Sequence, residues 1–308
     1  MESLKNYKKK LLDLYLKMHW RQWSAIGIQS HIPESDFPVD IEALLISTFR
    51  IARYDKRLFY AMLEWLDLNR NLVSVSRAKN ILKTLESDSD NKNDVSNTDL
   101  LINILKQGSV KSYIQVNIDN QYHEILREYS KRSVVQKITL NNNQLLQMKL
   151  RSIFGVNARA DIILYLLAER KQNANKIAKE IYYDQKIVHR VLKNWEMSDF
   201  VRRERAGNEI LYSLNEKSIF KDLNKVNNRE FINQPLVFFT LGRIISIINA
   251  PEFQEDPYLI SSQLRKIYND IIKVSNITDL KLEKEVNFPG EELFYYLQKK
   301  IIKIFSIY

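Results

Sequence analysis

Hydrophobic residues recur three and four positions apart along most of this chain, a pattern that predicts a mainly α-helical fold. Before residue 85 the pattern predicts helices over 4–23, 40–52, 55–68 and 75–85. Short helices are expected over 101–106 and 122–131, and longer ones over 235–249, 258–274 and 291–307. Residues 280–287 could form a strand or an extended segment.

A polar segment interrupts the helical pattern, and we use it to divide the chain. Residues 86–99 read ESDSDNKNDVSNTD, a composition that cannot bury apolar surface and that favours a mobile linker or loop. We therefore expect an N-terminal helical unit (1–85), this linker or loop (86–99), bridging helices (100–150), a compact central unit (151–215) and a C-terminal helical region (216–308).

The central unit has the pattern of a helix, a turn, a second helix and a two-stranded ribbon. The first helix has an apolar face formed by Ile177, Ala178 and Ile181. Asp184 can cap the second helix, whose core face consists of Val188, Val191, Leu192 and Trp195. Residues 206–209 contain a glycine and predict a hairpin turn, and apolar residues then alternate at 210, 212 and 214. An additional helix over 158–169, capped by Asn157, can close the same core.

This region resembles the winged helix-turn-helix domains of MarR-like and ArsR-like bacterial regulators. Their recognition stretch commonly runs IA-x-x-L-G-x-S-x-x-T-V-x-R-x-L-x-x-L-E-x-x-G-x-V. The positions that match this pattern are Ile177, Ala178, Asp184 in place of the capping serine, Val188, Arg190, Leu192, Trp195 and Val201. Tyr182 and Asp199 stand where the pattern has glycine, so we expect both turns to be wider than usual.

The second helix of this unit is expected to bind double-stranded DNA. Between residues 185 and 194 the sequence has three Lys or Arg residues and no acidic residue, and residues 201–205 hold three Arg against one Glu. In this interpretation the helix enters the major groove and the hairpin follows the backbone or the adjacent minor groove. The predicted contacts are Gln185, Lys186, His189 and Arg190 near base edges, Lys193 near phosphate, and Arg202, Arg203, Arg205 and Asn208 on the wing. Arg190 is the best candidate for base readout, because a guanidinium can contact guanine O6 and N7 together.

A second resemblance spans nearly the whole chain. The phrases HWRQWSAIGI (19–28), LLISTFRIARYDKRLFYAMLEWL (44–66), RSIFGVNARADIILYLL (151–167) and FPGEELFYYL (288–297) look like those of a largely uncharacterised group of bacterial winged-helix proteins of similar length. This resemblance implies a multi-helical frame around a winged helix, and it implies no ligand or target.

Composition and charge agree with a polyanionic partner. The 308 residues carry a net charge of +10 and a pI near 9.4. A genome with an AT bias also encodes a Lys-rich composition, so such a bias accounts for part of this excess of positive charge.

The chain has no cysteine, which excludes disulfides and thiolate chemistry and is compatible with a reducing cytoplasm. No signal peptide is apparent, and the longest apolar run (235–250) is too short to span a bilayer and contains Arg243. We expect a cytoplasmic protein with no membrane partner.

The sequence holds no pattern typical of an enzyme, a metal site or a cofactor site. The four histidines, His19, His31, His123 and His189, are scattered and lack ligand spacing, and the usual phosphate-binding glycine loops are absent. We expect no catalytic residue, metal or cofactor, and no set of residues identifies an effector pocket.

The sequence therefore favours a sequence-specific, double-stranded DNA-binding transcriptional regulator. The last predicted helix has a continuous apolar face that must pack against the protein's own core or a second subunit, and one winged helix covers little DNA, so we expect a homodimer. The alternative is a non-catalytic protein-interaction module, for example an antitoxin-like subunit whose winged helix contacts protein. The operator and the sign of regulation are left open by the sequence.

Overall fold

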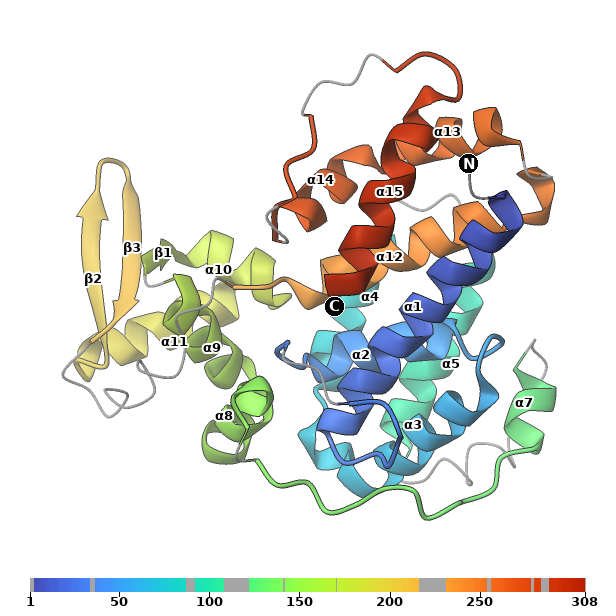
Figure 1. Ribbon diagram of the computed structural model, residues 1–308. Helices are drawn as coiled ribbons and strands as arrows, with labels where there is room; N and C mark the ends of the chain where they lie inside the picture. The colour runs from blue at the N-terminus through green and yellow to red at the C-terminus, as the bar shows by residue number, and fades with distance from the viewer. Residues whose placement is uncertain are drawn as a thin grey trace.

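The computed structural model describes residues 3–33, 37–86, 92–107, 122–140, 142–169, 171–215, 231–253, 256–277, 280–283 and 288–307. Among the described residues the protein is mainly helical, as the sequence predicts, with one small antiparallel sheet of three strands where the sequence predicts a two-stranded ribbon. Figure 1 shows a large helical part and, beside it, a smaller part that carries the sheet. We call the larger part the helical frame and the smaller part, residues 146–214, the α8–β3 unit.

The helical frame is built from segments at both ends of the chain. Its first half comprises α1 (Leu4–Ala25), α2 (Ile41–Arg50), α3 (Lys56–Asn69), the 3-10 turn η1 (Arg70–Leu72), α4 (Val75–Glu86), α5 (Lys92–Lys106) and α7 (His123–Arg127). Its second half comprises α12 (Gln234–Asn249), η3 (Pro251–Phe253), α13 (Pro257–Lys266), α14 (Tyr268–Ile277) and α15 (Glu292–Ile307). One hydrophobic core joins both halves, so helices that the sequence-based division treats separately share their packing.

Helix α12 lies in the middle of the frame and contacts α1, α2, α4, α13 and α14. Helix α15 packs on α1 and α13, and its apolar face is buried. The buried residues of that face are Leu293, Phe294, Leu297, Ile301, Ile304 and Phe305. Burial of each such side chain contributes roughly 1.5–3 kcal/mol. The partner that this helix requires is therefore the protein's own core.

The α8–β3 unit has its own hydrophobic core. The turn η2 (Asn143–Leu145) precedes the unit, which contains α8 (Leu146–Phe154), α9 (Ala158–Glu169), β1 (Lys171–Asn173), α10 (Ala174–Ile181), α11 (Gln185–Met197), β2 (Val201–Ala206) and β3 (Glu209–Leu214). The strand order is β1-β3-β2, and both pairings are antiparallel. The predicted caps are present: Asn157 Oδ1 accepts from Arg159 N at 2.9 Å, and Asp184 Oδ1 accepts from Lys186 N at 2.7 Å.

Several local predictions need correction. The segment over 86–99 was expected to be a loop, but α5 already begins at Lys92, and residues 87–91 lie outside the described ranges. The helix expected over 258–274 is divided into α13 and α14 at Ile267, and that expected over 122–131 is limited to His123–Arg127. Of the segment 280–287, residues 280–283 have no regular structure and the others lie outside the described ranges.

The two turns of the α8–β3 unit are not widened as expected. Tyr182 and Asp199 have φ angles of 59° and 53°, the left-handed conformation that glycine would adopt. Tyr182 is the C-cap of α10, and its N–H donates to Ala178 O. Tyr182 and Asp199 therefore adopt the turn conformation that glycine would adopt, at the cost of added backbone strain.

Within the described ranges, each helix is too short or too polar to cross a lipid bilayer.

Candidate nucleic-acid interface

Helix α11 presents one apolar and one polar face. Val188, Val191 and Leu192 are buried in the core of the α8–β3 unit, and Trp195 packs on Phe200 with ring centroids 5.0 Å apart. At about 100° per residue, these positions place the rest of the helix on the opposite side. The apolar stripe therefore fixes which side chains face outward.

The five predicted contacts on α11 all lie on its exposed side. They are Gln185, Lys186, His189, Arg190 and Lys193. The acidic residue of the same helix, Glu196, is placed near its C-terminal end, where it pairs with an arginine of β2. The N-terminal three turns of α11 therefore form a positive surface.

The hairpin β2–β3 extends beside α11. Alternation along β2 places Arg203 and Arg205 on the same face as buried Val201, and Arg202 and Glu204 on the opposite face. All three arginines are exposed, as is Asn208 at the tip of the hairpin. The structure thus brings the nine predicted residues onto two neighbouring elements.

The three arginines of the hairpin differ in their side-chain contacts. Arg203 forms an ion pair with Glu196 at 3.6 Å, with both side chains partly exposed, so it joins the hairpin to α11. Arg205 Nε donates to Gly207 O at 3.2 Å and lies near the tip. The side chain of Arg202 has no hydrogen bond or ion pair with the described residues. The adjacent Glu204 is paired with Lys171 of β1, so its negative charge is partly compensated.

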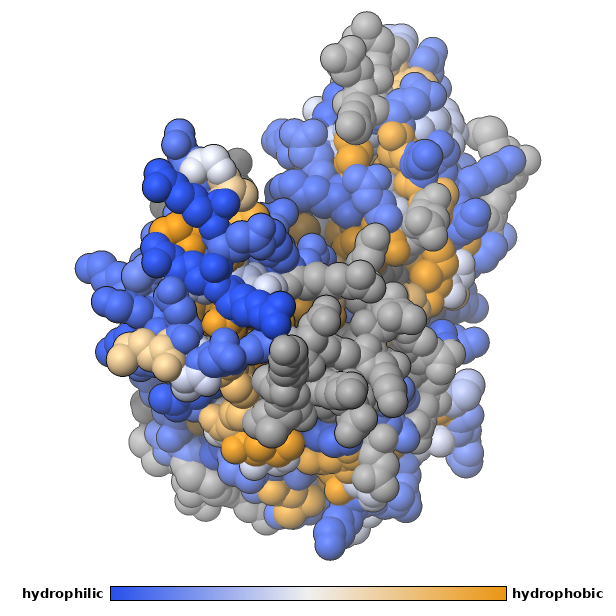
Figure 2. All heavy atoms as spheres, turned by 90° about the vertical axis from the view of Figure 1, so that its left-hand side faces the viewer, coloured by the Kyte–Doolittle hydropathy of each residue, from blue (hydrophilic) through white to orange (hydrophobic). Residues whose placement is uncertain are grey.

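Figure 2 views the molecule from the side of the hairpin, and hydrophilic residues cover much of the coloured surface there. Two exposed apolar side chains of α11 accompany the basic residues. Ile187 is 38% exposed and Met197 is 81% exposed. Neither residue is among the contacts predicted from the sequence, although both lie outside the stripe of Val188, Val191 and Leu192, a position that indicates exposure.

Tyr182 connects the turn before α11 to the helical frame. Its hydroxyl donates to Asn233 Oδ1 at 2.9 Å, and its carbonyl accepts from Asn80 Nδ2 at 3.0 Å. Burial raises the pKa of Tyr182, so this phenol stays protonated and acts as a donor. Contacts from α4 and from the start of α12 therefore stabilise a left-handed residue that would otherwise cost about 1–2 kcal/mol.

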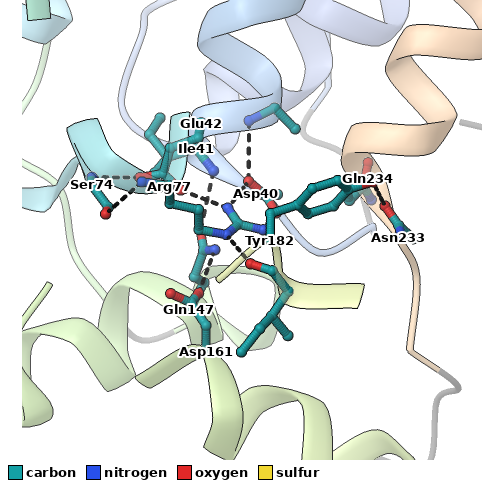
Figure 3. A network of polar contacts seen from close by, with 12 residues as sticks. Asp40, Ile41, Glu42, Ser74, Arg77, Gln147, Asp161, Tyr182, Asn233 and Gln234 are labelled. Atoms are coloured by element: carbon teal, nitrogen blue, oxygen red, sulfur yellow. Dashed lines mark hydrogen bonds and ion pairs between the residues drawn. The ribbon is translucent and has the colours of Figure 1, made fainter. Parts of the chain in front are cut away.

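A buried network of charged residues joins the frame to the α8–β3 unit (Figure 3). Arg77 of α4 pairs with Asp40 at 2.6 Å and Glu42 at 2.7 Å, and its Nε donates to Ile181 O at 3.0 Å. Arg151 of α8 pairs with Glu42 at 2.6 Å and with Asp161 of α9 at 3.1 Å. The side chains are nearly or fully buried, so these contacts set the position of the unit on the frame.

The network keeps its charges despite burial. Burial opposes ionisation of Arg77 and Arg151, but the neighbouring carboxylates outweigh this effect and raise the pKa of both guanidinium groups. Burial likewise acts to raise the pKa of Asp40, and the charge and hydrogen bonds of Arg77 bring that pKa below its ordinary value. This network has no local signal in the sequence, because its members are spread from residue 40 to residue 161.

Among the described residues, no group of three or more His, Asp or Glu side chains could hold a metal ion.

No protein-family model matches this sequence, and no curated protein or solved structure is similar enough to it to count as a match. Interpretation of the α8–β3 unit therefore depends on its own geometry.

Proposed function

We propose that the α8–β3 unit is a winged helix-turn-helix and that the protein binds double-stranded DNA as a transcriptional regulator. The observation that carries this proposal is the exposed, basic face of α11 beside a hairpin with three exposed arginines. The order of α9, β1, α10, α11, β2 and β3, with its three-stranded antiparallel sheet, supports it. Clustered cations on one face supply the electrostatic attraction that DNA-binding proteins require.

In the proposed complex, the N-terminal part of α11 lies in the major groove. Gln185, Lys186, His189 and Arg190 then approach base edges, and Lys193 approaches a phosphate. On the wing, Arg202 and Arg205 contact the backbone or the adjacent minor groove together with Asn208. Arg203 has a different role in this proposal, since its ion pair with Glu196 holds the wing against α11.

Charge reversal on α11 tests this proposal. We expect Lys186→Glu/Arg190→Glu to weaken binding to a fluorescent 30-base-pair duplex by at least about tenfold, because two phosphate-attracting charges become repulsive. The control is Lys9→Glu/Lys10→Glu, which changes the net charge equally on exposed positions of α1. Equal losses for both variants would show that only the overall charge matters, and no loss for either would refute the assigned face.

A protein-interaction module is the second candidate, and the exposed Met197 and Ile187 favour it. Exposed apolar side chains are typical of surfaces that bind protein. The same variants separate the two candidates: if charge reversal leaves DNA binding unchanged while Met197→Asp disrupts a protein complex, the interaction module replaces the regulator.

The proposal includes a homodimer in the cytoplasm. Because α15 is covered by the frame itself, only the small footprint of a single winged helix, roughly 600–1,000 Å², still argues for a second subunit. Light scattering with and without duplex DNA tests it, and a monomer in both conditions would refute the dimer.

A further inference from the structure

A cavity lies at the junction of the helical frame and the α8–β3 unit. Its volume is about 40 Å³. On the frame side it is lined by Asp40, Gln234 and Ile232, and on the other side by Leu164, Ala168 and Ile181. A water molecule needs roughly 10–15 Å³ measured in this way, so the cavity has room for about three water molecules or for a ligand of three or four non-hydrogen atoms.

Gln234 brings an unpartnered acceptor to this cavity. The side chain is 2% exposed, and its Nε2 donates to Pro38 O at 3.0 Å. Because a carbonyl oxygen can only accept, the amide orientation is fixed, and Oε1 is the atom left without a hydrogen-bond partner among the described residues. A buried acceptor without a donor is unfavourable, so a ligand that supplies an N–H or O–H group gains affinity here.

The charge at the cavity favours a cation. The buried network contains three carboxylates, Asp40, Glu42 and Asp161, and two guanidinium groups, a net charge of −1. Asp40 Oδ2 accepts a single hydrogen bond, from Arg77, and a carboxylate oxygen can accept a second one.

An anion is disfavoured at the same place. Arg77 lines the cavity, but four of its five N–H donors are engaged by Ile181 O, Asp40 and Glu42. A carboxylate or phosphate would therefore meet at most one free donor of this residue, beside the two carboxylates that line the cavity, Asp40 and Asp161.

We propose that this cavity binds a small primary ammonium ion of three or four non-hydrogen atoms. Its N–H groups donate to Gln234 Oε1 and Asp40 Oδ2, and its carbon atoms contact the apolar wall formed by Leu164 and Ile181. The bound ion contacts the frame and the α8–β3 unit at once, so it stabilises their docking. This inference does not depend on DNA binding.

The test measures binding of four small probes to the intact protein by heteronuclear NMR at pH 7. We expect ethanolamine and n-propylamine, both protonated at this pH, to saturate with Kd values between roughly 0.1 and 10 mM, since ligands of this size bind weakly. The changes in NMR chemical shift should be largest for residues that line the cavity. Acetate and n-propanol, which have four non-hydrogen atoms like n-propylamine, should bind at least tenfold more weakly.

Two variants locate the site. Gln234→Leu removes the acceptor, and Ala168→Leu fills the cavity without touching the charged network, so each should weaken amine binding at least tenfold. Gln22→Leu is the matched control: Gln22 is fully buried in α1 and no described residue pairs with its amide atoms, but it does not line this cavity.

The proposal is overturned by any of three results. The first is an absence of saturable amine binding up to 100 mM, which would leave water as the donor to Gln234. The second is equal binding of acetate or n-propanol. The third is amine binding that Ala168→Leu leaves unchanged, a result that is decisive even if Gln234→Leu fails to fold.

Discussion

Arg190 and Arg202 carry the same charge, but their positions predict different kinds of contact with DNA. Arg190 lies on the exposed face of α11, whereas Arg202 lies on the hairpin and has no partner among the described residues. If the proposed docking is correct, Arg190→Ala relaxes the preference at one or two base pairs and costs roughly 1–3 kcal/mol per half-site. Arg202→Ala weakens all sequences about equally and reduces the salt dependence by about one phosphate.

Binding assays with a selected and a scrambled duplex over a salt series measure this difference. Arg203 is unsuitable for the comparison, because its pairing with Glu196 mixes a structural effect with any contact to DNA. Equal, sequence-independent losses for Arg190→Ala and Arg202→Ala would exclude base readout by Arg190.

The two left-handed turn residues should respond oppositely to glycine. Asp199→Gly relieves backbone strain at an exposed position, so we expect a change within about 1 kcal/mol, neutral or stabilising. Tyr182→Gly relieves the same strain but removes a buried ring and its hydrogen bond to Asn233, so we expect a loss of roughly 2–4 kcal/mol. Urea unfolding measures both, and a stabilised Tyr182→Gly variant would contradict the docking role of this ring.

Elements with local signals could be predicted from the sequence, and elements that depend on distant partners could not. The cap at Asp184, the apolar stripe of α11 and the glycine turn of the hairpin are each encoded within a few residues. Strand β1 has the sequence KQN, which carries no alternation, and it is defined by its pairing with Leu211, Tyr212 and Ser213 of β3. The candidate DNA surface was therefore predictable, while the sheet's third strand was not.

The junction between the two parts of the molecule was also beyond sequence reasoning. Its polar network depends on contacts between residues more than 100 positions apart, such as that of Arg151 with Glu42 at 2.6 Å. Hydrophobic periodicity indicates which face of a helix is apolar. It does not indicate which charged residues from distant segments contact one another in the folded protein. The same reason explains why the cavity beside Gln234 had no signal in the sequence.

Disruption of this network should be costly. Glu42 accepts from both Arg77 and Arg151, so Glu42→Gln leaves two buried guanidinium groups undercompensated and is expected to destabilise the protein by about 3–5 kcal/mol. The control is Asp270→Asn, which breaks the exposed pair with Lys273 and should change stability by less than about 0.5 kcal/mol. Equal, small effects of the two variants on urea unfolding would contradict the assigned role of the network.

At the scale of the whole molecule, the frame core should become less stable in mild acid. His19 is fully buried between Tyr15 O and Ser47 Oγ, at 2.7 Å from each, and burial lowers its pKa to about 4. In the unfolded chain His19 therefore takes up a proton near pH 6.5, whereas in the folded protein His19 stays neutral at that pH. Stability contributed by neutral His19 is present above pH 6.5 and is lost as the pH falls toward 4, by up to about 3 kcal/mol.

Unfolding free energies at pH 7.0 and 5.0 test this expectation. His19→Gln should be less stable at pH 7 and should lose less stability on acidification than the wild-type protein. An identical pH dependence of the two proteins would show that His19 does not titrate as its burial implies.

The salt dependence of duplex binding by the wild-type protein tests the central claim most directly. We expect saturable binding to a 30-base-pair duplex at 50 mM salt, with log Kd rising linearly with log salt concentration. Three phosphate contacts, from Lys193, Arg202 and Arg205, imply a slope of about 3. Absence of saturable binding at 50 mM salt with tens of micromolar protein, or a slope near zero, would contradict the account.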